Sequence, residues 1–249
     1  MARSSHRPPW WAVVVSGLCG AMVAGTVVGL TTGGERSAHA AAVAESAVTV
    51  DAGARLATID VADETPSVTF VGDSWTVGEG ASGGRGYAVR TGDVLGWDYE
   101  VLGVGGSGYT RRGGGATFGQ RIDRAVETHA DVVVVQGSLN ERNAQPDVLA
   151  AAALATLSRL TSEVDPDTLV LVVGASYAPG TPDATIEWIN AAIGAAADRL
   201  GLLFVNPAEE NWTDPADAAI WADPDHPNDA GAQLIADRLA IRLASLLAA

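Results

Sequence analysis

A serine, a histidine and an aspartate in this sequence could together carry out nucleophilic chemistry. Ser74 directly follows a short apolar run, and Asp223 precedes His226 by three residues. A serine hydroxyl is a poor nucleophile until a neighbouring base takes its proton, and histidine suits that role because its ordinary pKa is about 6.5. A carboxylate on the other ring nitrogen fixes the tautomer of the histidine. We therefore predict Ser74 as nucleophile, His226 as general base and Asp223 as the acid that orients it.

The sequence contains four histidines, and one of them suits this role best. His6 and His39 belong to an N-terminal segment that resembles an export signal. We expect His129 at the C-terminal end of a helix, where a cation interacts favourably with the helix dipole. His226 precedes Pro227, which disfavours helical geometry and places the histidine in a loop. The alternative is that His226 is an ordinary exposed loop residue.

Short apolar runs alternate with longer amphipathic stretches from residue 67 onward. The runs predict β-strands at residues 67–71, 98–102, 131–136, 168–174 and 202–205. The amphipathic stretches predict helices near residues 85–96, 117–129, 147–163, 184–200 and 228–247. Strands that are apolar throughout and are separated by helices indicate a parallel sheet covered on both faces. The sequence therefore predicts one α/β domain.

The candidate residues lie where the predicted strands end. Residues 72–75, Gly-Asp-Ser-Trp, follow the first strand, and the glycine-rich residues 103–108 follow the second. Residues 137–141 follow the third strand, and residues 223–228 precede the last helix. Ligands of parallel sheets bind beyond the carboxyl ends of the strands. We therefore expect these four segments to meet at one edge of the sheet.

These four segments resemble the sequence blocks of the SGNH hydrolases, also called the GDSL esterase/lipase family. The block that names the family appears as Gly72-Asp73-Ser74, with tryptophan at position 75 where leucine is common. Gly106 matches the glycine of the second block, and Asn140 matches the asparagine of the third. Asp223 and His226 match the last block. The resemblance runs from the first predicted strand to the last predicted helix.

The resemblance implies a three-layer α/β/α fold, flavodoxin-like, with a parallel sheet of about five strands. It implies that Ser74 attacks an ester carbonyl, that His226 takes and later returns the proton, and that Asp223 orients His226. The oxyanion hole would consist of the backbone N–H groups of Ser74 and Gly106 and the side-chain amide of Asn140. No metal ion or organic cofactor is implied.

Two features of the third block depart from the family pattern. Glu141 stands where aspartate is usual, and two residues instead of one separate Gly137 from Asn140. Other readings of the site residues also stay open. Gly106 is one of four glycines in its segment and could serve a turn that needs a positive φ. Ser74 could be a helix N-cap, and Asn140 could be an ordinary turn residue.

The charge of the chain disfavours several classes of partner. It has 30 acidic residues against 15 basic ones, a formal net charge of −15. Nucleic acids and anionic membranes attract proteins through cationic groups, so neither is expected as a partner. We expect a small-molecule, glycan or lipid ester as substrate, with acetyl or other short acyl groups favoured.

The first forty residues resemble an export signal. Arg3 and Arg7 precede an uncharged stretch at residues 10–30, and Ala38-His39-Ala40 offers a cleavage site between small residues. About 20 apolar residues can span a bilayer, so an uncleaved membrane anchor is the alternative. We predict an extracytoplasmic protein in three parts: residues 1–40, a signal peptide or anchor; residues 41–65, a linker; and residues 66–249, the hydrolase domain.

Other functions fit the sequence less well than an exported serine esterase does. Gly103-x-Gly105-x-x-Gly108 matches a dinucleotide fingerprint, but the triple glycine at 113–115 is unsuited to the helix that this motif needs. Asp223, Asp225 and Asp229 lack the regular oxygen-donor loop of a calcium site. A non-catalytic surface or carbohydrate-binding protein on the same fold, or an acyltransferase, stays open as an alternative.

Overall fold

The computed structural model describes residues 65–247 of the chain. The expected export segment, residues 1–40, and almost all of the expected linker, residues 41–65, lie outside the described residues. Among residues 65–247, no helix combines the length and the apolar character needed to cross a membrane.

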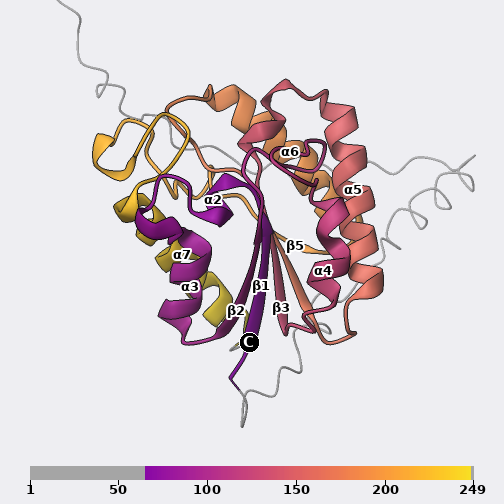
Figure 1. Ribbon diagram of the computed structural model, residues 1–249. Coiled ribbons are helices and arrows are strands. Elements are labelled where there is room, and N and C mark those ends of the chain that lie inside the picture. Colours follow the sequence, from indigo (N-terminus) through magenta and orange to yellow (C-terminus); the bar gives the residue numbers. More distant parts are fainter. Residues whose placement is uncertain (1–64, 248–249) are drawn as a thin grey trace, which may run out of the picture. The chain divides into compact units, whose positions relative to one another are not determined.

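Five parallel strands form the centre of the fold, in the order β2-β1-β3-β4-β5 (Figure 1). They are β1 (Ser67–Gly72), β2 (Asp98–Gly103), β3 (Val132–Gln136), β4 (Leu169–Val173) and β5 (Leu203–Val205). Every residue of β3 and β4 is buried, because helices cover both faces of the sheet. Strand β2 lies at an edge and begins with the exposed residues Asp98 and Tyr99.

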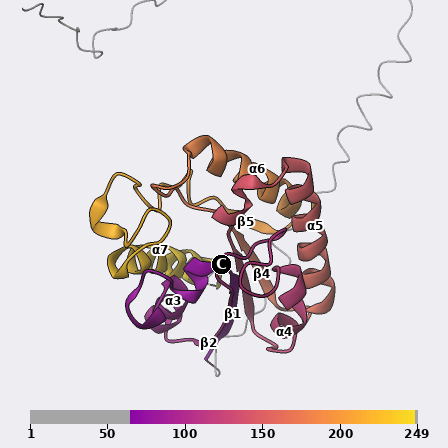
Figure 2. The same cartoon turned by 45° about the horizontal axis from the view of Figure 1, so that its top comes forward.

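Helices form a layer on each face of the sheet, with α3 and α7 on one side and α4, α5 and α6 on the other (Figures 1 and 2). The long helices are α3 (Tyr87–Leu95), α5 (Pro146–Glu163), α6 (Asp183–Arg199) and α7 (Asp229–Leu247). The short helices and 3₁₀ turns are α2 (Ser74–Val77), α4 (Ile122–Val126), η1 (Ser82–Gly84), η2 (Gly119–Arg121), η3 (Leu139–Asn143) and η4 (Ala218–Ile220).

The fold class predicted from the sequence is confirmed, since five parallel strands lie between two layers of helices. Each predicted strand is present within one residue of its expected ends. The predicted helix over residues 117–129 is wrong in extent, because α4 spans only Ile122–Val126 after the single turn η2. After α4 the chain turns so tightly that His129 adopts a φ of 49°, in the left-handed region that ends helices. Helix α2 is too short to leave a periodic signal in the sequence.

Candidate active site

Ser74 is the first residue of helix α2, at the carboxyl end of strand β1, which lies between β2 and β3 (Figure 1). The N-cap of this helix is Asp73, whose Oδ1 accepts a hydrogen bond of 2.9 Å from the backbone N–H of Trp75. The alternative role of Ser74 as the N-cap is therefore wrong. Asp73 ends the strand and starts the helix, and this turn places the Ser74 hydroxyl at the edge where the other predicted segments meet.

His226 faces Ser74 and Asp223 with its two ring nitrogens. Its Nε2 lies 3.1 Å from Ser74 Oγ, and its Nδ1 lies 2.9 Å from Asp223 Oδ2. The Oδ1 atom of Asp223 also accepts the backbone N–H groups of Asp225 and His226, each at 2.8 Å. Partial burial raises the pKa of Asp223, but the hydrogen bonds from His226 and the backbone outweigh it and hold that pKa below its ordinary value. The carboxylate is therefore ionised and fixed against the imidazole.

Trp75 connects the serine turn to the histidine loop. Its indole Nε1 donates to the backbone oxygen of Asp225 at 2.7 Å. Its ring also packs against Trp221, with centroids 5.9 Å apart and planes tilted by 59°. An antiparallel bridge between Trp221 and Pro227 closes the loop that carries His226. Tryptophan at this position thus has a partner that the leucine common in the family would lack.

A cavity of about 160 Å³ opens beside Ser74. The residues that line it include all those expected at the site except Asp223: Asp73, Ser74, Trp75, Glu79, Gly106, Leu139, Asn140, Arg142, Asp225 and His226. Of the four glycines between residues 103 and 108, Gly106 is the one that lines it. Gly106 also has a φ of 70°, in the left-handed region that favours glycine. Its role in a turn is therefore compatible with its position at the cavity.

Asn140 is held by two hydrogen bonds at the start of the turn η3. Its Nδ2 donates to the backbone oxygen of Ser107 at 2.9 Å, and its backbone N–H donates to Ser138 Oγ at 3.0 Å. The amide has two N–H groups, so one is fixed by the glycine-rich segment and the other is left for the cavity. The reading of Asn140 as an ordinary turn residue does not account for this link between two segments.

Glu141 has a structural role that explains why it replaces aspartate. Its side chain is fully buried, and its two oxygens accept the backbone N–H of Thr110, at 2.9 Å, and the hydroxyl of Thr110. The carboxylate occupies the space beside Gly108, where a Cβ atom would collide with Oε1. The longer side chain of glutamate thus ties the turn that carries Asn140 to the segment that carries Gly106.

Arg121 lies buried beneath the site and was not anticipated from the sequence. Its Nη1 donates to the backbone oxygens of Gly72, at 2.9 Å, and Leu102, and its Nη2 donates to Ser107 Oγ at 2.9 Å. One guanidinium therefore holds the ends of β1 and β2 and the glycine-rich segment together. Burial lowers the pKa of Arg121 to about 10, which still leaves it charged at neutral pH.

Asp73 is a second buried charge in this region. Its side chain is 1% exposed, and burial raises its pKa from 3.8 to about 6. A hydrogen bond from Ser138, the N–H of Trp75 and the positive charges nearby oppose this rise. The Ser138 hydroxyl has a single proton, which it donates to the backbone oxygen of Ser107, 2.9 Å away. Asp73 therefore receives only part of the stabilisation that an ionised buried carboxylate needs.

Two charged residues at the cavity were also missed by the sequence analysis. Glu79 places Oε2 at 3.3 Å from His226 Nε2, on the same side of the ring as Ser74. Arg142 binds Asp225 with its two terminal guanidinium nitrogens, each at 3.1 Å from a carboxylate oxygen. Neither residue belongs to a recognisable motif, and their partners, His226 and Asp225, lie in a loop that is distant in the sequence.

His129 lies at the opposite end of the sheet, before strand β3. The expectation that it ends a helix is wrong, since α4 stops at Val126. Its Nδ1 instead lies 3.0 Å from Asp165 Oδ2, and 72% of its side chain is exposed. This exposed pair gives His129 an ordinary explanation, as expected, although the partner is a carboxylate and not the helix terminus.

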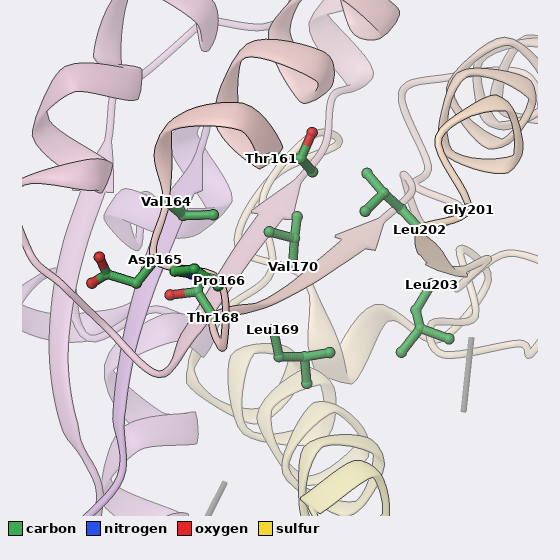
Figure 3. A pocket seen from close by; sticks show the side chains of 10 residues that line it. All are labelled: Thr161, Val164, Asp165, Pro166, Thr168, Leu169, Val170, Gly201, Leu202 and Leu203. Atoms are coloured by element: carbon green, nitrogen blue, oxygen red, sulfur yellow. The ribbon is translucent and has the colours of Figure 1, made fainter. Parts of the chain in front are cut away.

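A second cavity, of about 180 Å³, lies at the amino ends of β4 and β5 (Figure 3). Its walls are Thr161, Val164, Asp165, Pro166, Thr168, Leu169, Val170, Gly201, Leu202 and Leu203. Neither a serine nor a histidine is among them, so the nucleophilic chemistry considered for Ser74 has no counterpart there.

The structure also tests the two other interpretations of the sequence, a dinucleotide-binding motif and a calcium site. After Gly108 the next helical turn of the described chain begins only at Gly119, so the third glycine opens no helix toward a pyrophosphate. The three aspartates near His226 each have a separate partner: Asp223 binds His226, Asp225 binds Arg142, and Asp229 binds Arg90. Within residues 65–247, no three acidic, histidine or cysteine side chains are grouped closely enough to hold a metal ion.

Residues 70–234 match the GDSL-like lipase/acylhydrolase family. A GDSL lipase of Mycobacterium tuberculosis is 30% identical over 184 residues, which cover 70% of this chain and 79% of that protein. A carbohydrate acetylesterase from Sinorhizobium meliloti has a similar fold, with a TM-score of 0.56 and 18% identity over 73% of this chain and all of that one. An aryl esterase of M. smegmatis is similar at a TM-score of 0.57 and 15% identity, over 74% of this chain and all of that one.

Proposed function

This chain belongs to the GDSL-like lipase/acylhydrolase family and is a hydrolase that acts on esters, and we propose that it does so through an acyl-enzyme on Ser74. In this proposal His226 is the general base and Asp223 orients it. The observation that carries it is the contact of His226 Nε2 with Ser74 Oγ, 3.1 Å apart, while Nδ1 is held by Asp223. That geometry leaves the lone pair of Nε2 directed at the serine proton.

The reaction proceeds in two halves. Ser74 Oγ attacks the ester carbonyl while its proton passes to His226 Nε2, and the imidazolium is stabilised by Asp223. The oxyanion is bound by the backbone N–H groups of Ser74 and Gly106 and by the free N–H of Asn140, and each such donor is worth about 3 kcal/mol of barrier. His226 then gives the proton to the leaving alcohol. Water, deprotonated by the same nitrogen, releases the acid from Ser74.

We further propose that the acyl group is short, with acetyl favoured. The cavity beside Ser74 measures about 160 Å³, below the roughly 300–1,000 Å³ of sites that enclose drug-sized ligands. A similar fold in a carbohydrate acetylesterase agrees with this size, although the likeness itself concerns the fold alone. A lipid ester would need its long chain to lie outside this cavity.

The test of this proposal uses the purified full-length chain and two variants. We expect a fluorophosphonate probe to label the wild-type protein and His129→Ala, and to fail on Ser74→Ala. We expect p-nitrophenyl acetate to be hydrolysed faster than the octanoate and palmitate esters. A folded protein that hydrolyses none of them and is not labelled would be a non-catalytic binding protein. Equal activity of Ser74→Ala and wild type would remove Ser74 as nucleophile, and transfer of the acetyl group to an added alcohol would make the chain an acyltransferase.

We also propose that the hydrolase domain is exported. The support is the basic start and the uncharged stretch at residues 10–30. Cell fractionation followed by N-terminal sequencing of the mature protein tests this. A new N-terminus near residue 41 in the extracellular fraction indicates a cleaved signal, and an intact N-terminus in the membrane fraction indicates an anchor. Activity found only in the cytoplasm would contradict export.

A further inference from the structure

Glu79 brings another carboxylate to the histidine of the proposed mechanism. Its Oε2 lies 3.3 Å from His226 Nε2, the nitrogen that faces Ser74 Oγ at 3.1 Å. Its Oε1 lies against Gly105, where a Cβ atom would collide with it. With 47% of its side chain exposed, Glu79 lies at the rim of the cavity, between the histidine loop and the glycine-rich segment.

The alcohol that leaves the ester must pass close to this carboxylate. When the ester C–O bond breaks, His226 Nε2 donates its proton to the alcohol oxygen, which therefore comes within hydrogen-bond distance of that nitrogen. Because Glu79 Oε2 is 3.3 Å from the same nitrogen, groups within a few bonds of the alcohol oxygen can reach it. This geometry places the alcohol part of the substrate within reach of Glu79.

Within residues 65–247, no side chain donates a hydrogen bond to the Glu79 carboxylate while His226 Nε2 acts as a base. An ionised carboxylate only accepts, and His226 is its one ion-pair partner among the described residues. When His226 acts as base, its Nε2 carries a lone pair and gives Glu79 no proton. Arg142, the cation at the same cavity, is bound by Asp225 through both of its terminal nitrogens.

We infer, on the basis of the proposed function, that Glu79 is a specificity-determining residue that selects esters whose alcohol carries a hydroxyl or an ammonium near the ester oxygen. Such a donor supplies the hydrogen bond that neither His226 nor Arg142 gives. An alcohol without a donor shields the carboxylate of Glu79 but gives it no hydrogen bond, which disfavours binding. The net charge of −15 adds a long-range attraction for ammonium groups.

Two pairs of acetate esters of equal shape test this inference. The hydroxyl pair is 2-hydroxyethyl acetate and propyl acetate, and the ammonium pair is 2-(dimethylamino)ethyl acetate, protonated at pH 7, and 3-methylbutyl acetate. The measurement is kcat/KM at pH 7, by titration of the released acid, for wild type, Glu79→Gln and Glu127→Gln. Glu127 is an exposed acid that precedes β3, so its variant loses the same charge away from the site.

We expect the wild type to prefer the donor-bearing ester of each pair. Glu79→Gln should reduce that preference about threefold to tenfold, as for the loss of a partly exposed charged hydrogen-bond partner, and Glu127→Gln should leave it unchanged. A reduction confined to the ammonium pair would identify the substrate alcohol as a cation, and one confined to the hydroxyl pair would identify it as a neutral polyol. Unchanged preferences in Glu79→Gln, even with a general loss of rate, would overturn the inference, since Glu79 would then act only on His226.

Failure of the proposed function gives a different result. In that case none of the four esters is hydrolysed by the wild type and the fluorophosphonate probe leaves Ser74 unlabelled, which refutes the inference along with the function. If Ser74 is labelled and propyl acetate is hydrolysed, the proposed function stands. The comparison of ester preferences then tests only the role of Glu79 in specificity.

Discussion

Replacement of Asp73 by asparagine should stabilise the protein at neutral pH. The carboxyl group is 1% exposed, and burial raises its pKa to about 6. Asparagine is as good an N-cap as aspartate, and its Oδ1 can keep the hydrogen bond of 2.9 Å from the N–H of Trp75. The substitution therefore removes a buried negative charge while the helix cap stays in place.

The size of this effect follows from the pKa. A rise from 3.8 to about 6 corresponds to at most about 3 kcal/mol, because each tenfold change in proton affinity is worth about 1.4 kcal/mol. Above pH 6 the carboxyl group of Asp73 is ionised in both the folded and the unfolded chain, so the folded state bears the whole cost. Between pH 6 and 3.8 the folded chain holds a proton that the unfolded chain lacks, so the cost declines as the pH falls. Below pH 3.8 both states are protonated and the cost is absent.

Urea unfolding at several pH values between 4 and 8 measures this effect. We expect the free energy of unfolding of Asp73→Asn to exceed that of wild type by about 2–3 kcal/mol at pH 8, and by little at pH 4. Asp223→Asn provides the contrast, because the pKa of Asp223 is lowered and its ionised form stabilises the fold above its unfolded pKa. That variant should be less stable than wild type at pH 8. A difference between Asp73→Asn and wild type that is negative, or that is the same at pH 4 and pH 8, would refute the reasoning.

Three further substitutions test the site. His226→Ala should abolish turnover, whereas His129→Ala should keep it nearly intact. Equal losses of ester hydrolysis in the two variants would refute the assignment of His226 as the general base. Asn140→Ala should lower kcat about 100- to 1,000-fold with little change in KM, and a twofold effect would remove its amide from the oxyanion hole. Glu141→Ala leaves the partly buried donors of Thr110 unpaired and should lower the free energy of unfolding by about 2 kcal/mol in urea titrations, whereas no loss would show that water replaces the carboxylate.

The strands were predictable because burial on both faces leaves a simple signal. A run such as the four valines at 132–135 is apolar throughout, and a strand with both faces covered by helices requires this. The helix around Ile122–Val126 was overestimated for a related reason. Its apolar spacing is real, but periodicity does not register the tight turn at His129, where φ is 49°. Local geometry of this kind is decided by how the chain must enter the next strand.

The candidate site was predictable only where a residue type is tied to a motif. Ser74, Asp223 and His226 follow from spacing and from their places beside predicted elements, and the structure brings them within hydrogen-bond distance. Arg121 and Glu79 give no such signal, since surface arginines and glutamates are common. Their importance comes from contacts across the fold, such as that of Arg121 with the ends of β1 and β2, and these contacts depend on tertiary packing.

Trp75 and Glu141, two residues that differ from those usual in the family, have a common physical consequence. Trp75 gains a hydrogen bond to the backbone of Asp225, and Glu141 gains two bonds to Thr110, so each larger side chain joins its own segment to another one. The first bond couples the serine turn to the histidine loop, and the second couples the turn of Asn140 to the glycine-rich segment. All four segments that carry the proposed catalytic groups are thereby linked in pairs by side chains. Because a misplacement of about 1 Å can cost a hundredfold in rate, these links help to hold the serine, the base and the oxyanion donors in one geometry.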